Sequence, residues 1–84
     1  MGKYDRLVAQ ILSGASDANI AFADLVHLMH RLGFEERIRG SHHVFRMPGV
    51  EEKINLQKDR SKAKPYQVRQ VRGVILKYKL GVSE

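Results

Sequence analysis

Apolar residues recur with the spacing of an amphipathic helix in three stretches of the chain. The first covers residues 3–12, where they stand at i, i+3, i+4 and i+7, and Gly14 follows as a helix stop. The second covers residues 22–33, and Gly33 suits the position just after a helix C-terminus. The third begins at Pro65, whose missing N–H costs nothing in the first turn of a helix. The sequence therefore predicts three helices.

Between the second and third helices the pattern changes to the alternation of apolar and polar residues that is typical of strands. The predicted strands are residues 34–39, 42–47 and 52–57. Gly40 and Ser41 predict a tight hairpin turn with glycine in its first central position. Pro48 and Gly49 separate the next two strands. Residues 58–64, KDRSKAK, are predicted to form a basic, solvated loop.

The predicted order of elements is helix, helix, three antiparallel strands, helix. This order is typical of a small two-layer α+β domain, in which a three-stranded sheet packs on helices and leaves its other face open. In the first strand Phe34 and Ile38 share one face, and Arg37 and Arg39 share the other. We find no internal repeat and no domain boundary, so residues 1–84 are expected to form one domain.

Composition restricts the classes of function. The chain has no cysteine, which excludes disulfides and cysteine-based zinc sites and favours a reducing cytoplasm. We expect no membrane association, since no run could span a bilayer and the first residues lack the apolar segment of a signal peptide. Fifteen Lys and Arg against nine Asp and Glu give a formal net charge of +6. This balance favours a polyanionic partner such as nucleic acid, although excess lysine can also serve solubility alone.

Strand alternation places the adjacent histidines of RGSHHVF on opposite faces of the sheet. If Phe45 points into the core, His43 points there too and is structural. His42 then lies on the open face, which it shares with Val44, Arg46, Lys53, Asn55 and Gln57. An imidazole in such surroundings can transfer a proton during RNA transesterification while cations hold the phosphate. An exposed strand histidine beside arginine is also common without any catalytic role.

A metal site is the other interpretation that the histidines suggest. His27 and His30 are three residues apart on the second predicted helix and could share a metal ion with His42 or His43. Both lie away from the apolar stripe, and no carboxylate or cysteine completes a convincing ligand set. We therefore interpret His27 and His30 as solvated and expect no metal and no cofactor. The sequence also lacks a P-loop, a nucleophile elbow and a dinucleotide-binding fingerprint.

Three segments carry a resemblance to a known family: LGFEERIRGSHHVFRMPG, INLQ and KAKPYQVRQVRGVI. From Phe22 to Leu80, the sequence resembles the HicA toxins of bacterial toxin–antitoxin systems. The most specific element is GSHH, residues 40–43, with an aromatic residue two positions on. The segment KPYQVRQVR supports the resemblance independently.

This resemblance implies a fold similar to the double-stranded-RNA-binding domain (dsRBD). It also implies an mRNA interferase that takes part in the bacterial stress response and is held in check by a HicB-type antitoxin. The family's catalytic histidine directly follows Gly-Ser, which corresponds to His42 in this sequence. Gly40 and Ser41 then correspond to the turn that positions it.

The sequence departs from the short members of the family in two segments. Residues 1–20 form an extra N-terminal extension, with a whole predicted helix, on a core of residues 21–80. The extension could cap the core, form a dimer surface or contribute to the antitoxin site. Residues 58–64 replace a segment that contains proline and histidine in short members.

We therefore expect a metal-independent endoribonuclease that cleaves mRNA and arrests translation, with His42 as general base or acid. Attack by the 2′-OH would give a 2′,3′-cyclic phosphate, and the free toxin is expected to be a monomer. The residues expected to contact RNA are Gly40, Ser41, Arg46, Lys53, Lys58, Arg69 and Arg72. Two alternatives stay open: a module that binds structured RNA without cutting it, and a degenerate toxin that acts only through partner binding.

Overall fold

Within residues 2–81, which the computed structural model describes, the chain forms three α-helices, a short 3₁₀ turn and a four-stranded antiparallel sheet. In chain order the elements are α1 (Lys3–Ser13), η1 (Asp17–Asn19), α2 (Phe22–Leu32), β1 (Glu35–Arg39), β2 (His42–Met47), β3 (Val50–Asp59), β4 (Lys62–Ala63) and α3 (Pro65–Tyr78). The strands are ordered β1-β2-β3-β4 across the sheet. The predicted α+β class is confirmed and is consistent with a dsRBD-like fold, and β4 is added to the three predicted strands.

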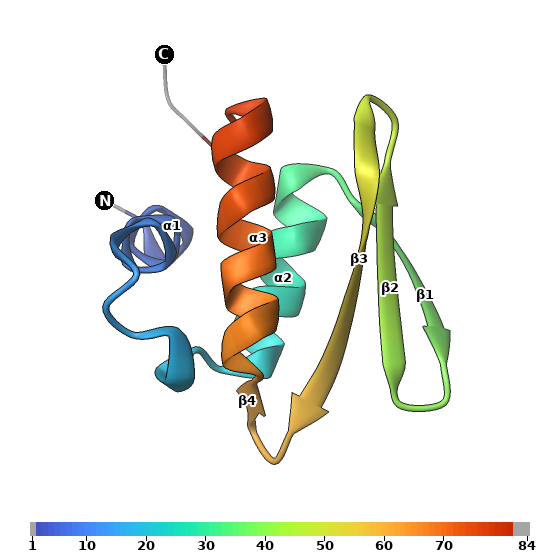
Figure 1. Ribbon diagram of the computed structural model, residues 1–84, viewed down its shortest axis with the longest axis horizontal. Coiled ribbons are helices and arrows are strands. Elements are labelled where there is room, and N and C mark those ends of the chain that lie inside the picture. Colours follow the sequence, from blue (N-terminus) through green and yellow to red (C-terminus); the bar gives the residue numbers. More distant parts are fainter. Residues whose placement is uncertain (1, 82–84) are drawn as a thin grey trace.

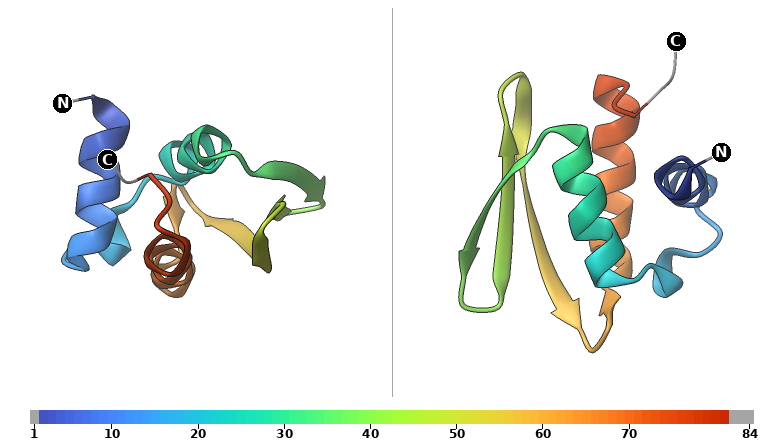
Figure 2. Two further views of the ribbon diagram at one scale, coloured as in Figure 1. Left: turned by 90° about the horizontal axis from the view of Figure 1, so that it is seen from above. Right: turned by 180° about the vertical axis from the view of Figure 1, so that it is seen from behind.

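The elements are arranged in layers. Helices α2 and α3 lie against one face of the sheet, and α1 lies on the far side of these two helices (Figure 1; Figure 2, left). Among the described residues, no helix covers the other face of the sheet (Figure 2, left). The sheet therefore has a core-facing side and an open side, as the alternation predicts.

The first two helices end where their glycines predict. Gly14 and Gly33 follow α1 and α2 in left-handed conformations, with φ of 72° and 104°. Leu7 and Ile11 of α1 are buried in the core that all the layers share. The N-terminal extension therefore caps the core.

Within residues 2–81, no helix is long and apolar enough to cross a membrane.

A two-residue turn fixes the register of β1 and β2. Gly40 and Ser41 form this turn, and Gly40 has a φ of 57°, which glycine adopts without the strain that a Cβ would cause. As a result, His42 pairs with Arg39 of β1 across the turn. On its other side, His42 pairs with Gln57 of β3.

The prediction of a solvated loop over residues 58–64 is wrong. Lys58 and Asp59 belong to β3, and the chain then turns back to form β4. Ala63 of β4 is only 1% exposed, and its backbone N–H donates a hydrogen bond to the carbonyl oxygen of Ile20 (2.9 Å). Two residues are too few to show an alternating pattern, so the sequence carries no sign of a strand that is stabilised by contact with a distant segment.

One position on the core-facing side of the sheet is exposed. Ile38 lies on the helix-facing side of β1, as alternation predicts, but it is 58% exposed. Strand β1 is at the edge of the sheet, whereas Phe45, Ile54 and Leu56 on β2 and β3 are fully buried. Alternation assigns the face of a residue, but burial also depends on what lies over that face.

Candidate active site

His42 is the first residue of β2 and lies exposed on the open face of the sheet. The turn before it brings it beside Arg39, and the pairing of β2 with β3 places it opposite Gln57. Its ring Nδ1 is 3.4 Å from Oδ1 of Asn55, a neighbour on β3. This placement agrees with the prediction from alternation and leaves the imidazole accessible to a ligand.

His43 has different surroundings, although it is adjacent in sequence. Its side chain is 23% exposed, and its ring packs edge-on against Phe22 of α2, with 5.0 Å between the ring centroids. Its Nδ1 is 2.6 Å from Oε2 of Glu36. A carboxylate can only accept, so the Nδ1–H group of His43 donates this hydrogen bond. The prediction that His43 faces the helices is confirmed, and its contacts agree with a structural role.

Glu36 binds a second histidine as well. Nε2 of His30 lies 2.8 Å from Oε1 of Glu36, so one carboxylate joins α2, β1 and β2. Burial acts to raise the pKa of Glu36, but hydrogen bonds from His43 and His30, and then the charges on these rings, lower it on balance below its usual 4.5. His30 is exposed, as predicted, but it also contacts Glu36. Alternation puts Glu36 on the face of Phe34 and Ile38, but it cannot show which residue of α2 lies opposite.

The other helix histidine also has a protein partner. Nδ1 of His27 lies 3.3 Å from the hydroxyl of Tyr4 on α1, while the residue as a whole is exposed. Within residues 2–81, no three or more His, Cys, Asp or Glu side chains are arranged to hold a metal ion.

A hollow of ≈ 450 Å³ on the open face of the sheet is lined by Glu35, Glu36 and Val44 and by four cationic side chains: Arg37, Arg39, Arg46 and Lys53. All four are exposed, and within residues 2–81 none has a carboxylate oxygen within 4.0 Å. We call this set the open-face cations. Arg46 and Lys53 are among the residues predicted to contact RNA. Arg37 and Arg39 are not, although alternation already places them on this face.

Two other predicted RNA contacts lie away from His42. Lys58 is exposed on β3 beyond the residue that pairs with His42, where it pairs with Ala63 of β4. By alternation it shares the side of Leu56 and not that of the open-face cations. Arg69 is exposed on α3, on the other side of the sheet. The structure therefore places Arg46 and Lys53 on the face of His42, but not Lys58 or Arg69. Arg46 and Lys53 lie four residues along β2 and β3 from His42 and its partner Gln57, and His42 does not line the hollow.

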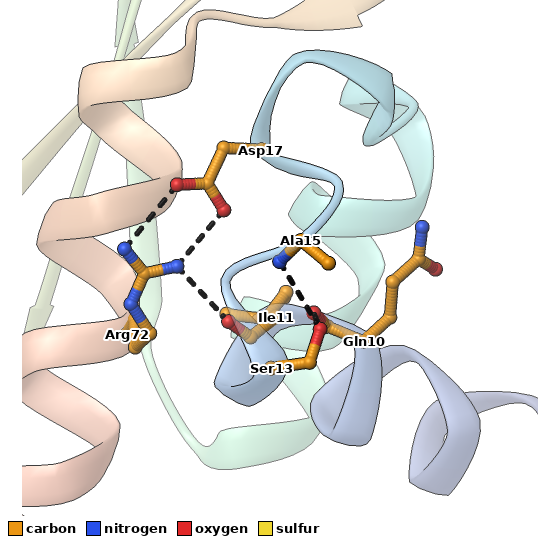
Figure 3. A network of polar contacts seen from close by, with 6 residues as sticks. All are labelled: Gln10, Ile11, Ser13, Ala15, Asp17 and Arg72. Carbon is orange, nitrogen blue, oxygen red and sulfur yellow. Dashed lines mark hydrogen bonds and ion pairs between the residues drawn. The ribbon is translucent and has the colours of Figure 1, made fainter.

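Arg72, another of the predicted RNA contacts, is hydrogen-bonded within the protein. Its guanidinium donates two hydrogen bonds to the carboxylate of Asp17, at 2.8 and 3.2 Å, and one to the carbonyl oxygen of Ile11, at 3.1 Å (Figure 3). The Arg72 side chain is only 21% exposed. These bonds join α3 to the end of α1 and to η1, so Arg72 is left out of the proposed RNA interface.

A further polar network surrounds the turn before His42. Nε2 of Gln57 donates to Oγ of Ser41 (3.2 Å), and Oε1 of Gln57 accepts from Nζ of Lys64 (3.3 Å). The backbone N–H of Gln57 donates to Oε1 of Gln67 (3.0 Å), which is buried at the start of α3. Prediction from sequence missed the roles of Gln57, Lys64 and Gln67, because these contacts depend on how the start of α3 is placed against β3.

Comparisons with models of protein families, with curated proteins and with solved structures find no match to this chain. The chemistry of the site is that of an exposed imidazole, a group that can transfer a proton, on the same face as unpaired cations. Such cations can bind a phosphate and stabilise charge that develops on it. These two capabilities together suit transfer reactions at a phosphodiester.

Proposed function

We propose that this protein is a metal-independent endoribonuclease that cleaves mRNA, the toxin of a bacterial toxin–antitoxin system. The observation that carries the proposal is the different placement of two adjacent histidines. His43 is packed against α2 and bound to Glu36, whereas His42 is exposed on the face of the open-face cations. The resemblance of the GSHH segment and of the KPYQVRQVR segment to HicA toxins supports the same assignment.

In the proposed reaction, His42 takes the proton of a ribose 2′-OH, and the 2′ oxygen attacks the adjacent phosphorus. A bond forms between the 2′ oxygen and phosphorus, and the bond from phosphorus to the 5′ oxygen breaks. The leaving 5′ oxygen takes a proton from the imidazolium or from water. Arg39, which pairs with His42, stabilises the charge on the phosphate oxygens, and the other open-face cations bind neighbouring phosphates of the strand, so the step needs no metal. The products are a 2′,3′-cyclic phosphate and a 5′-hydroxyl.

The proposed partner is a HicB-type antitoxin that covers this face. The resemblance supports such a partner, and the unpaired open-face cations suit an acidic protein surface. Co-expression with the product of the neighbouring reading frame tests this part of the proposal. Formation of a complex that abolishes RNA cleavage is the expected result.

Induced expression in a bacterial host tests the nuclease. The wild type is expected to fragment mRNA and stop growth, and His42→Ala is expected to do neither. His27→Ala is the matched control, because it removes another exposed histidine outside the site and is expected to behave as wild type. With purified protein, EDTA should leave cleavage unchanged. If wild type leaves RNA intact, the nuclease proposal fails, and if His42→Ala is equally toxic, His42 is not the catalyst.

Binding without cleavage is the rival function, and the salt dependence of binding measures what the cations contribute. We expect His42→Ala to bind RNA about as tightly as the wild type, since the open-face cations remain. Adding Arg39→Gln or Arg46→Gln should weaken binding and reduce the slope of log K against log salt by about 0.7 for each phosphate of a single strand that the variant no longer binds. Lys3→Gln, on the far side of the molecule, should leave that slope unchanged. An unaltered slope in the arginine variants would remove the open face from the RNA-binding surface.

A further inference from the structure

The amide of Asn55 contacts the ring of His42. Its Oδ1 lies 3.4 Å from Nδ1 of the imidazole, a long hydrogen bond between two exposed side chains on adjacent strands. Asn55 pairs with Val44, so it lies diagonally across from His42 on the same face of the sheet. Within residues 2–81, the structure gives the other ring nitrogen of His42, Nε2, no hydrogen-bond partner.

The strand that carries Asn55 is held firmly at this point. Gln57, directly opposite His42, is bound through its backbone to Gln67 and through its side chain to Ser41 and Lys64. Gln67 is only 2% exposed, so this anchor reaches into the core. These bonds fix β3 relative to the turn that precedes His42. The backbones that carry Asn55 and His42 are therefore held in register by bonds that reach the core.

An amide oxygen can only accept a hydrogen bond. Where Oδ1 of Asn55 faces Nδ1 of the neutral imidazole, the proton must lie on Nδ1, and the lone pair is then on Nε2. We propose that Asn55 is a positioning residue that holds His42 in the Nδ1–H tautomer and so leaves Nε2 as the atom that takes the proton of the 2′-OH. The catalytic part of this proposal rests on the proposed nuclease function, whereas the tautomer does not.

Nitrogen NMR of the histidine rings tests the tautomer without any activity. At a pH where the imidazole is neutral, long-range proton–nitrogen correlations distinguish a protonated Nδ1 from a protonated Nε2, and His42→Ala identifies the signals. We expect a protonated Nδ1 in the wild type and in Asn55→Asp, which keeps only acceptor oxygens. Asn55→Leu, which has no acceptor, should shift the ring toward the Nε2–H form. Glu51→Gln, elsewhere on β3, should change nothing.

A protonated Nε2 in the wild type would overturn the proposal, because the amide would then donate to Nδ1. An unchanged tautomer in Asn55→Leu would overturn it equally. Asn55 is exposed, and strands tolerate leucine at such positions, so the variant is expected to fold.

Cleavage kinetics test the catalytic role. Under single-turnover conditions, Asn55→Leu should lower the maximal rate of RNA cleavage by about tenfold. Asn55→Asp should retain more of that rate. The affinity for RNA, measured in the His42→Ala background, should be the same with or without Asn55→Leu. If wild type cleaves no RNA, the proposed function fails while the tautomer result stands. If wild type cleaves RNA and Asn55→Leu cleaves it equally fast, the positioning role fails.

Discussion

Adjacent residues on a strand can differ more in their environment than residues far apart in the chain. His42 and His43 show this, since one faces solvent and cations and the other faces a carboxylate and an aromatic ring. Alternation alone predicts the division, because a residue and its successor must point to opposite faces. What alternation cannot supply is the partner of each ring. Strand register and the position of α2 decide that Asn55 is the partner of His42 and Glu36 that of His43.

At Gly73, in the middle of α3, the fold leaves room for a larger residue. A Cβ at this position would meet nothing within 4 Å outside its own helix. Glycine in a helix interior costs about 0.5–1 kcal/mol relative to alanine. We therefore expect Gly73→Ala to raise the free energy of unfolding by about that amount and the Tm by about 3–6 °C, measured by thermal and urea unfolding.

Gly14 is the contrasting control for that substitution. It has a φ of 72°, and a Cβ there would lie 3.4 Å from the guanidinium of Arg72. Gly14→Ala should therefore lower stability by about 1 kcal/mol. Equal effects of the two substitutions would contradict the view that backbone conformation decides which glycine can be replaced.

At the scale of elements, both hydrophobic burial and a few polar contacts hold the helices in place. Leu7 and Ile11 of α1 are buried, and Arg72 of α3 joins the end of α1 to η1 (Figure 3). On the other side of α3, the hydroxyl of Tyr78 donates to Glu52 of β3 (2.6 Å). These contacts fix how the elements are placed, after apolar patterning has decided which faces meet.

Replacing Arg72 with methionine tests the polar contact between α1, η1 and α3. The change keeps an unbranched side chain of similar length but leaves Asp17, only 15% exposed, without its cation. We expect a loss of about 2 kcal/mol in the free energy of unfolding, measured with urea. Asp17→Asn in the same background should cost less than it does in the wild type, as a double-mutant cycle requires.

Arg69→Met is the matched control on the same helix. Arg69 is exposed, and within residues 2–81 it forms no ion pair, so its replacement should change stability by less than about 0.5 kcal/mol. If the two arginine variants lose equal stability, the contact with Asp17 does not stabilise the fold.

The elements that the sequence predicts and those that it misses differ in how far apart in the chain the residues lie that define them. The three helices and three long strands carry their own periodicity and their own glycine or proline ends, so a local pattern is enough to predict them. Strand β4 and the pairing of Arg72 with Asp17 depend on segments about forty or more residues away in the chain. The same distinction holds within the site. The face of His42 is local information, whereas its contact with Asn55 requires the register of β2 and β3.

At the scale of the whole molecule, the ion pairs lie away from the open face of the sheet. Four acidic residues are paired with cations or histidines on the core-facing side of the sheet or on the helices: Asp17, Asp24, Glu36 and Glu52. The open-face cations have no such partners among residues 2–81. The open face, where these four cations lie beside Glu35, therefore carries more positive than negative charge, which suits a polyanion.

Glu36 connects that open sheet to the helices, and it makes stability depend on pH. Its pKa is lowered in the folded protein, so its contribution is fully present above the usual value of 4.5 and is lost as the pH falls through the lowered pKa. The urea midpoint of wild type should exceed that of Glu36→Gln at about pH 6, and the gap should shrink as the pH is taken below 4.5 toward about pH 3. Glu51→Gln, at an exposed site on β3, should show no such gap. A gap that persists undiminished at the lowest pH would mean that packing of Glu36, and not its charge, joins α2 to the sheet.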